Sequence, residues 1–381
     1  MIGDNFLVAA FERQDVPNGI FSKQKMVVSD HINVREHVSG IGIPAWSENA
    51  QKSDVDASIV TQLMASGMVM IGKGQVDDFG VSISGKNAFY SDLRNPINRK
   101  CRVGGASSGI AVAVASGKAT LGVGNASNGG VTVPAAYCNL YGYRPTPGML
   151  DMLGVKPLSA TFDSVGFMSK SIPLLQQVFE KCSGPRQMLA LSGIQYATNL
   201  FKSLLTEEQQ NKVSEKLTSV NCPLEENTSL SKILLTQSAQ IHAVIMGREV
   251  EMEYGEWLDS HKPSLDEETQ QYLDSIRGFD FKELVEAKKK KAVFSETLCS
   301  IFKSGELLMV PTMPGTAPPR TGDLAESYFQ NQKRLIAIGE VAGLPQLTIP
   351  FLQIDEFPFG ISLLAQPNED KLLFDAAMRW F

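Results

Sequence analysis

Two glycine-rich stretches with an apolar helix between them constrain this chain more than any other feature. The first, residues 104–109, reads Gly-Gly-Ala-Ser-Ser-Gly, and the second, residues 122–130, reads Gly-Val-Gly-Asn-Ala-Ser-Asn-Gly-Gly. Residues 110–116 between them are almost entirely Ala, Val and Ile, which predicts a helix that is buried on all sides. The sequence therefore predicts a central helix between two tight backbone turns.

Each glycine-rich stretch has two interpretations. Free backbone N–H groups in such a turn, or at the start of a helix, form a cradle for an anion or an oxyanion. The alternative is a tight turn in which only glycine fits, and the local sequence leaves both open. The second stretch matches neither a phosphate-binding loop nor a dinucleotide fingerprint, so no cofactor is expected. The candidate cradle residues are Ser107, Ser108, Ser127, Asn128 and Gly129.

Residues 105–109 also match Gly-x-Ser-x-Gly, which would make Ser107 the nucleophile of a hydrolase elbow. That arrangement needs a histidine later in the chain. His242 and His261 are the only later histidines, and both fall in a charged, helical part of the sequence. A Ser–His–acid triad is therefore disfavoured.

Short apolar runs alternate with helical patterns in the first third of the chain. Residues 26–32 and 68–71 are predicted to be buried strands, and residues 54–65 an amphipathic helix, because apolar residues recur at every fourth position. A strand–helix–strand unit favours a parallel or mixed sheet.

The sequence changes character at about residue 172. Residues 172–303 are more charged and mostly helical, whereas strand-like patterns return at 305–314 and 347–364. The run Lys288–Lys291 keeps apolar neighbours at helical spacing, which indicates a solvated helix face. The chain of 381 residues thus has an α/β core in two arms around a helical insertion.

Composition excludes several classes of function. Lys plus Arg number 35 and Asp plus Glu 41, so the net charge of −6 lacks the electrostatic footprint of a nucleic-acid binder. The five cysteines are widely spaced with no Cys-x-x-Cys pair, which argues against disulfides and a zinc site and favours a reducing, intracellular compartment. No apolar run approaches the ~18 residues of a membrane span. We expect no metal, no cofactor and no membrane-spanning helix.

A series of motifs runs along the chain in this order: Asp30-His-Ile, the segment 71–79, Asn95-Pro, the segments 104–109 and 129–138, Gly142-Tyr-Arg-Pro145, the segment 162–166, Val310-Pro-Thr-Met-Pro314, the segment 343–350 and Gly360-Ile-Ser-Leu-Leu364. Their order resembles the amidase signature family. The resemblance implies an α/β fold with a large mixed β-sheet sandwiched between helices, in a single domain over residues 1–381 with a mainly helical insertion at about 172–303. The segments 40–46, 82–87 and 163–167 further resemble plant indole-3-acetamide hydrolases and the amidase-like domain of chloroplast and mitochondrial outer-envelope import receptors.

Family enzymes hydrolyse amides with a Ser–cis-Ser–Lys relay, and the resemblance places its three positions here. The lysine that precedes the first Asp corresponds to Ser29, the cis-serine to Ala106 and the nucleophile to Gly130. Gly130 has no side chain with which to attack, Ala106 cannot relay a proton, and the Ser29 hydroxyl is no base at neutral pH. The positions are 77 and 24 residues apart, as the family spacing requires. We expect the catalytic function to be lost.

Neighbouring residues are weak substitutes. Lys25 lies four strand positions from Ser29, about 13 Å away, and Lys73 matches a lysine that is not catalytic in the family. Ser107 and Ser127 carry hydroxyls, but no base is evident for either. The usual Asp of the second turn is also replaced in the region of residues 125–126, and the usual Arg by Thr132.

The resulting expectation is a pseudoenzyme whose fold serves as a binding or scaffold subunit of a protein complex, with protein partners that the sequence does not identify. The alternatives are a divergent hydrolase of small aryl or indole amides and a non-catalytic small-molecule binder. The compartment is expected to be an organelle, a chloroplast by the resemblance, or the cytoplasm.

Overall fold

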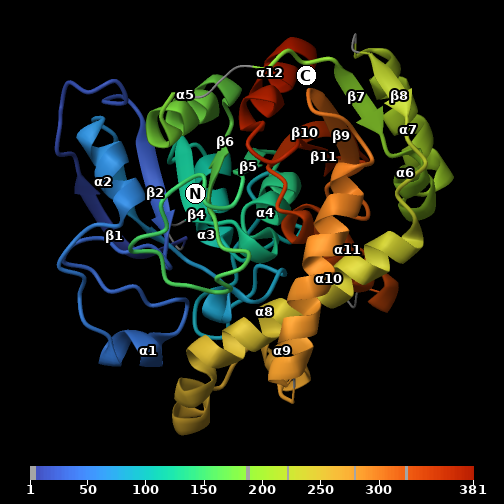
Figure 1. Cartoon of the computed structure of the whole chain (residues 1–381). Coiled ribbons are helices and arrows are strands. Elements are labelled where there is room, and N and C mark those ends of the chain that lie inside the picture. Colours follow the sequence, from blue (N-terminus) through green and yellow to red (C-terminus); the bar gives the residue numbers. More distant parts are fainter. Residues whose placement is uncertain (1–5, 186–188, 221–222, 279, 322–324) are drawn as a thin grey trace.

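A computed structural model gives the structure of this protein, and it describes residues 6–185, 189–220, 223–278, 280–321 and 325–381. The described residues form three layers, with one sheet between two layers of helices (Figure 1). The expected α/β fold with a large mixed sheet is confirmed.

The middle layer is an 11-stranded mixed sheet in the described part of the chain, with the order β1-β3-β2-β4-β6-β5-β10-β11-β9-β7-β8. Strand β2 pairs in parallel with both β3 and β4. The successive neighbours β4, β6, β5, β10, β11 and β9 pair antiparallel, and β7 pairs in parallel with β9 and β8. The strands are β1 (Leu7–Arg13), β2 (Lys25–Ser29), β3 (Val69–Gly74), β4 (Leu121–Asn125), β5 (Tyr141–Arg144), β6 (Val165–Ser169), β7 (Gly193–Tyr196), β8 (Leu224–Glu226), β9 (Glu306–Pro311), β10 (Gln346–Ile354) and β11 (Phe357–Leu364).

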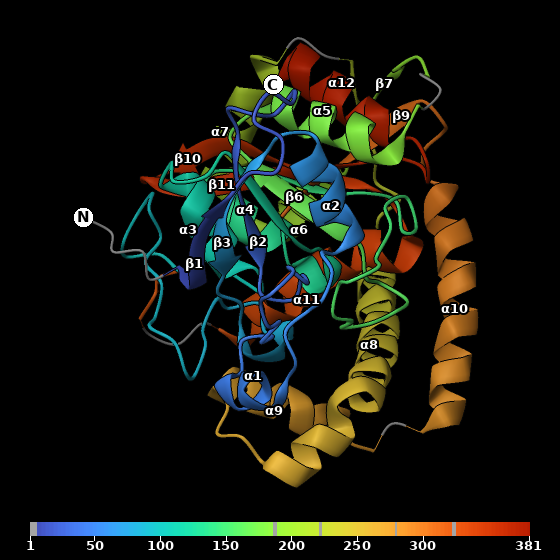
Figure 2. The same ribbon diagram turned by 90° about the vertical axis from the view of Figure 1, so that its left-hand side faces the viewer.

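Helices cover both faces of the sheet. Apolar side chains of α2, α5, α7 and α12 pack against one face, and those of α3, α4, α8, α10 and α11 against the other. Figure 2 shows α8 and α10 standing side by side and reaching beyond the sheet. The helices are α1 (Pro44–Asn49), α2 (Ser58–Ala65), α3 (Ser108–Ala115), α4 (Thr132–Tyr137), α5 (Ile172–Ser183), α6 (Thr198–Leu204), α7 (Glu207–Thr218), α8 (Lys232–His261), α9 (Glu267–Ile276), α10 (Phe281–Cys299), α11 (Glu326–Ala342) and α12 (Asp370–Trp380).

Successive side chains of β2 point alternately to the two faces of the sheet, and this decides on which face Ser29 lies. Met26 and Val28 are buried in the core under α2 and α5, whereas Val27 belongs to the core under α3. Successive strand residues point to opposite faces, so Ser29 shares the α3 face with Val27. The first family position therefore lies on the face that carries both glycine-rich turns.

The central helix is confirmed: all eight residues of α3 are buried. Two glycines let it approach the sheet closely. A Cβ on Gly74 would lie 2.8 Å from Ile110 Cγ2, and one on Gly124 would lie 2.6 Å from Ser107 Oγ. The helix predicted over 54–65 begins later, at Ser58, because Asp56 is drawn into an ion pair with Arg13 instead.

The segment 172–303 is mostly helical, but it also adds β7 and β8 to one end of the sheet. These strands of four and three residues are too short for their alternation to be recognised in the sequence. In the Lys-rich run, Lys288 to Lys290 are exposed and Lys291 is half-buried. None of the described helices has the length and apolarity that crossing a membrane requires.

Candidate functional site

The two glycine-rich turns meet at the carboxyl ends of the parallel strands. Ser107 N in the first turn donates to Gly130 O in the second at 3.2 Å. The peptide bond between Gly105 and Ala106 is cis. Ser29 ends β2, which lies between β3 and β4 in the sheet, so the structure brings the three family positions to one region at the start of α3.

The second turn has no free backbone donor among its four central N–H groups. Ser127 N donates to Asn125 Oδ1 at 3.1 Å, and Gly130 N to Ser127 O at 2.9 Å. Asn128 N and Gly129 N donate to the two carboxylate oxygens of Glu340 at 3.0 and 2.8 Å. The anion that this cradle holds is therefore a carboxylate of the same chain.

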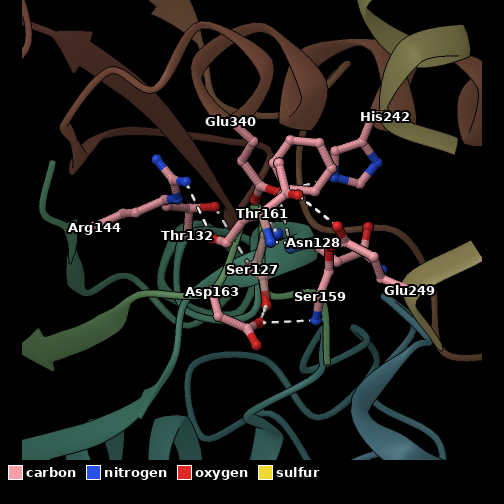
Figure 3. Close-up of polar contacts among 12 residues, drawn as sticks. Ser127, Asn128, Thr132, Arg144, Ser159, Thr161, Asp163, His242, Glu249 and Glu340 are labelled. Atoms are coloured by element: carbon pink, nitrogen blue, oxygen red, sulfur yellow. Dashed lines mark hydrogen bonds and ion pairs between the residues drawn. The ribbon is translucent and has the colours of Figure 1, made fainter. Parts of the chain in front are cut away.

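Glu340 comes from α11 and is 2% exposed. Its Oε2 lies 2.9 Å from His242 Nε2 on α8, so one carboxylate joins the turn to two helices (Figure 3). Burial on its own raises the pKa of Glu340. Hydrogen bonds from His242 and Gly129, with the charges of His242 and Arg144, outweigh burial and leave that pKa below its usual value. Glu340 thus fills the turn as a charged carboxylate.

Ser127 is held from the other side by Asp163. The Ser127 hydroxyl donates to Asp163 Oδ1 at 2.6 Å, and the Asn125 side chain donates to the same oxygen at 2.9 Å. Asp163 also accepts the backbone N–H groups of Leu158 and Ser159. Burial raises the pKa of Asp163, although these hydrogen bonds oppose the rise. The Ser127 hydroxyl is therefore a structural donor.

The loop that supplies Asp163 is anchored to α8. Glu249 accepts hydrogen bonds from the Ser159 hydroxyl at 2.6 Å and from the Thr161 N–H and hydroxyl at 3.0 and 2.5 Å. Lys288 of α10 forms an ion pair with the same carboxylate at 2.8 Å. Two helices of the segment 172–303 therefore hold the second turn in place. Helix α8 does so through His242 on Glu340 and through Glu249 (Figure 3), and α10 does so through the ion pair of Lys288 with Glu249.

The backbone around Gly130 leaves no room for a side chain. A Cβ placed there would lie 2.4 Å from Asn125 O and 3.0 Å from Ser127 O. Both neighbours are backbone oxygens of the same tight turn, so they cannot rotate away. The turn has closed around a glycine at the position where the family resemblance places the nucleophile.

The first turn is less well satisfied. Ser107 and Ser108 are buried, and the Ser108 hydroxyl has no hydrogen-bond partner among the described residues. Asp77 packs against Gly105, and burial raises the pKa of Asp77 well above its usual value. Its Oδ2 accepts Gly85 N, whereas its Oδ1 has no partner in the described part of the chain.

Neither nearby lysine is directed at Ser29. Lys73 is fully buried, donates to Val38 O at 2.6 Å and pairs with Asp30 at 3.3 Å, while Lys25 is exposed and pairs with Glu12. Burial lowers the pKa of Lys73, and Asp30 opposes that change. The Ser29 hydroxyl has no hydrogen-bond partner among the described residues.

No described histidine hydrogen-bonds to a candidate serine. His31 lies near the first turn, where it contacts Phe79 O, and burial lowers its pKa. His261 is exposed and stacks on Trp257. His242 lies at the second turn, where its side chain hydrogen-bonds to Glu340. No group of His, Cys, Asp and Glu in the described residues is arranged to hold a metal ion. Four cysteines are free thiols, and Cys222 lies outside the described residues.

A cavity of about 600 Å³ opens beside the second turn. Asn128 and His242 form its edge at the turn, and α9 forms another wall. Ser127 does not line it, because its hydroxyl is turned toward Asp163. Of the five candidate cradle residues, therefore, only Asn128 reaches the cavity.

Several residues that shape this site had no role in the sequence-based prediction. Glu340, His242 and Glu249 lie in helices far from the turns along the chain, and Asp163 was part of a motif without an assigned role. Glu340 does carry a signal, because it is a lone acid in the apolar run 335–342. A charge in such a run is expected to have a buried partner, but the sequence does not say which.

Solved structures with this architecture are amidases and their relatives. A structure titled as an amidase superposes with a TM-score of 0.85 at 19% identity, over 97% of this chain and 90% of that chain. A glutamyl-tRNA(Gln) amidotransferase subunit of Thermotoga maritima gives 0.81 at 21% identity, over 97% and 85%. At this identity the likeness defines the class of fold, an amidase-like α/β protein.

The sequence relatives agree with that fold. The family model described as Amidase matches residues 25–214. The translocon at the outer membrane of chloroplasts 64 of Pisum sativum is 29% identical over 93% of this chain and 65% of its own length. Amidase 1 of Arabidopsis thaliana is 26% identical over 91% of this chain and 89% of its own length. The chain belongs to the amidase signature family.

Proposed function

We propose that this chain is a catalytically inactive amidase-family protein that serves as a binding subunit of a protein complex. The observation that carries the proposal is the carboxylate of Glu340 on the N–H groups of Asn128 and Gly129. An oxyanion hole works because its donors are free to meet the negative charge that develops in the transition state. Donors that already hold a buried carboxylate are not free.

Two further observations support the loss of chemistry. Glycine stands at the position of the nucleophile, and the turn has no space for a Cβ there. The hydroxyls nearest to it are committed elsewhere or lack a base: Ser127 donates to Asp163, and no described histidine or lysine hydrogen-bonds to Ser107. A nucleophile without an adjacent base is weak at neutral pH.

The binding role is supported by the relatives. The chain spans 65% of the length of two of the plant relatives that it matches, and both have the names of chloroplast outer-membrane or outer-envelope proteins. We propose a similar organellar setting, with a protein partner bound through a surface that the active relatives do not need.

The first test is turnover. The purified chain is incubated with indole-3-acetamide and simple aryl amides, with Arabidopsis Amidase 1 as a parallel sample, and a fluorophosphonate probe reports reactive serines. We expect no product and no labelling. Labelling that disappears in Ser107→Ala or Ser127→Ala would replace this proposal by a divergent amide hydrolase.

The second test is association. Affinity purification of the full chain from its own tissue should return at least one protein in stoichiometric amount. A chain that purifies alone as a monomer would contradict the scaffold role and leave the turnover result unchanged.

A small-molecule binding role is the second candidate, and the cavity of about 600 Å³ favours it. Ligand pockets of proteins span roughly 300–1,000 Å³, so a small organic molecule fits.

A further inference from the structure

One wall of the cavity beside the second turn carries a buried arginine that forms no ion pair with any residue that the structure describes. Arg102 is 9% exposed and lines the cavity. Its Nε donates to Pro319 O at 3.4 Å, and its two terminal nitrogens make no hydrogen bond or ion pair with another described residue. A guanidinium offers paired donors in a fixed plane, so this cation at the cavity wall is well suited to an anionic ligand group.

The backbone holds Arg102 rigidly. Its N–H donates to Pro318 O at 2.9 Å, and its carbonyl accepts the Asn95 side chain at 2.9 Å. Cys101 next to it forms a β-bridge with Pro319. A fork-shaped group fixed in this way loses little freedom on binding, and planar carboxylates match its geometry with two parallel hydrogen bonds.

The helix α9 supplies the opposite charge. Glu268 is half-buried in the first turn of α9 and lines the same cavity. Burial raises the pKa of Glu268, and the charge of Arg102 lowers it, so the two groups are close enough to interact. They form no ion pair within 4.0 Å among the described residues. Arg102 and Glu268 therefore line the same cavity with opposite charges and without an ion pair between them in the described part of the chain.

The wall that carries Glu268 is also fixed. Asp266 caps α9 by accepting Glu268 N at 3.1 Å, and Asp266 N donates to Asp78 Oδ2 at 2.7 Å. The lining of the same cavity includes the apolar side chains of Met246, Ile276 and Phe329.

The remaining charges at this cavity nearly cancel. Lys86 and Lys333 are exposed basic residues of the lining, Glu267 and Glu326 are exposed acids, and Asp266 is half-buried as the cap of α9. The Tyr272 hydroxyl is buried with no partner among the described residues, although its side chain lines the cavity. A ligand with a single net charge would therefore leave one of the two inner groups unmatched.

We propose that this cavity binds a small zwitterion, an amino acid with an apolar body, with its carboxylate on Arg102 and its ammonium group on Glu268. The proposal deepens the binding role proposed above and rests on it. No bond is made or broken, because the N–H groups of the second turn remain on Glu340.

Saturation-transfer NMR on the full chain tests the proposal with glycine, 4-aminobutanoate and 5-aminopentanoate. Pentanoate, pentylamine and pentanamide are the matched probes that lack one or both charges. We expect one of the longer amino acids to bind at least about tenfold more tightly than all three matched probes, because each lost charged hydrogen bond removes about that factor or more. Equal binding of pentanamide would overturn the proposal in favour of an amide ligand.

Variants locate the site. Arg102→Gln and Glu268→Gln should each weaken binding about tenfold, whereas Arg94→Gln and Glu253→Gln, at exposed positions outside the cavity lining, should leave it unchanged. Arg102→Lys keeps the charge without the fork and should retain part of the affinity, which covers the case in which Arg102→Gln does not fold. Absence of binding by every amino acid would overturn this inference alone, while turnover of an amide would overturn only the inactivity proposed above.

Discussion

The two glycine-rich turns are joined by the hydrogen bond from Ser107 N to Gly130 O. They differ in how many of their polar groups have hydrogen-bond partners. In the second turn every backbone N–H from Ser127 to Gly130 has an acceptor within the chain. Next to the first turn, the buried Ser108 hydroxyl and Asp77 Oδ1 have no partner among the described residues.

This difference shows which turn satisfies its own polar groups. A buried polar group without a partner costs free energy, so a turn whose donors already have acceptors within the chain gains less from a ligand. The second turn has been closed by Glu340 and Asp163. Beside the first turn, the Ser108 hydroxyl and Asp77 Oδ1 remain without a hydrogen-bond partner among the described residues.

The largest expected effect is that of Glu340→Ala. The change leaves two backbone N–H groups and His242 without their shared acceptor, so we expect a loss of about 3–5 kcal/mol in the free energy of unfolding. Urea unfolding followed by circular dichroism measures it. Glu253→Ala, at an exposed position of α8, is the control and should change stability by no more than about 0.5 kcal/mol. Equal effects would mean that the carboxylate does not hold the turn.

Gly130→Ser should come next. It restores the hydroxyl of the family position, but its Cβ meets Asn125 O at 2.4 Å, so we expect a loss of about 1–3 kcal/mol and no amidase activity. Gly315→Ser is the matched control, because a Cβ there finds only one atom within 4 Å, at 3.9 Å. A stable Gly130→Ser protein that hydrolyses an aryl amide would contradict the closed turn.

The charge on Glu340 predicts a pH dependence. Its pKa in the folded protein lies below the usual 4.5, so its contribution is fully present above about pH 4.5 and is lost as the pH falls through the folded value. One proton adds up to about 1.4 kcal/mol per pH unit to the slope of stability against pH. Glu340→Gln should flatten that slope below pH 4.5 relative to the unchanged protein. Parallel slopes would show that the carboxylate titrates normally.

The smallest expected effect is a difference in stability between two variants that each lose one serine hydroxyl, one from each turn. Ser127→Ala removes a hydrogen bond to Asp163 and should cost about 1 kcal/mol, whereas Ser108→Ala removes a hydroxyl without a protein partner and should be neutral or slightly stabilising. Thermal unfolding of the two variants side by side measures the difference. A larger loss for Ser108→Ala would reverse the comparison between the turns.

Much of the scaffold could be predicted from the sequence. The apolar run 110–116 has no polar face, so its burial follows from composition alone, and strand-like patterns located β2, β3 and β9 to within a few residues. The helix over 54–65 was predicted too long, because the ion pair of Asp56 with Arg13 depends on a distant strand. The short strands β7 and β8 gave no detectable period.

The candidate site was predictable only in part. Asn128 lines a cavity, but its N–H donates to Glu340, an acceptor that the sequence did not indicate. The role of Ser127 also changed, from a candidate in the cradle to a donor for Asp163.

The sequence by itself determined the identities and the spacing of Ser29, Ala106 and Gly130, and the family resemblance predicts that they stand at the three catalytic positions. Only the tertiary structure decided what fills the second turn. Glu340 lies 211 residues beyond Gly129, and the two meet because α11 packs over the turn. A backbone N–H donates to any acceptor that the fold brings within reach. Spacing along the chain therefore does not reveal which acceptor it meets.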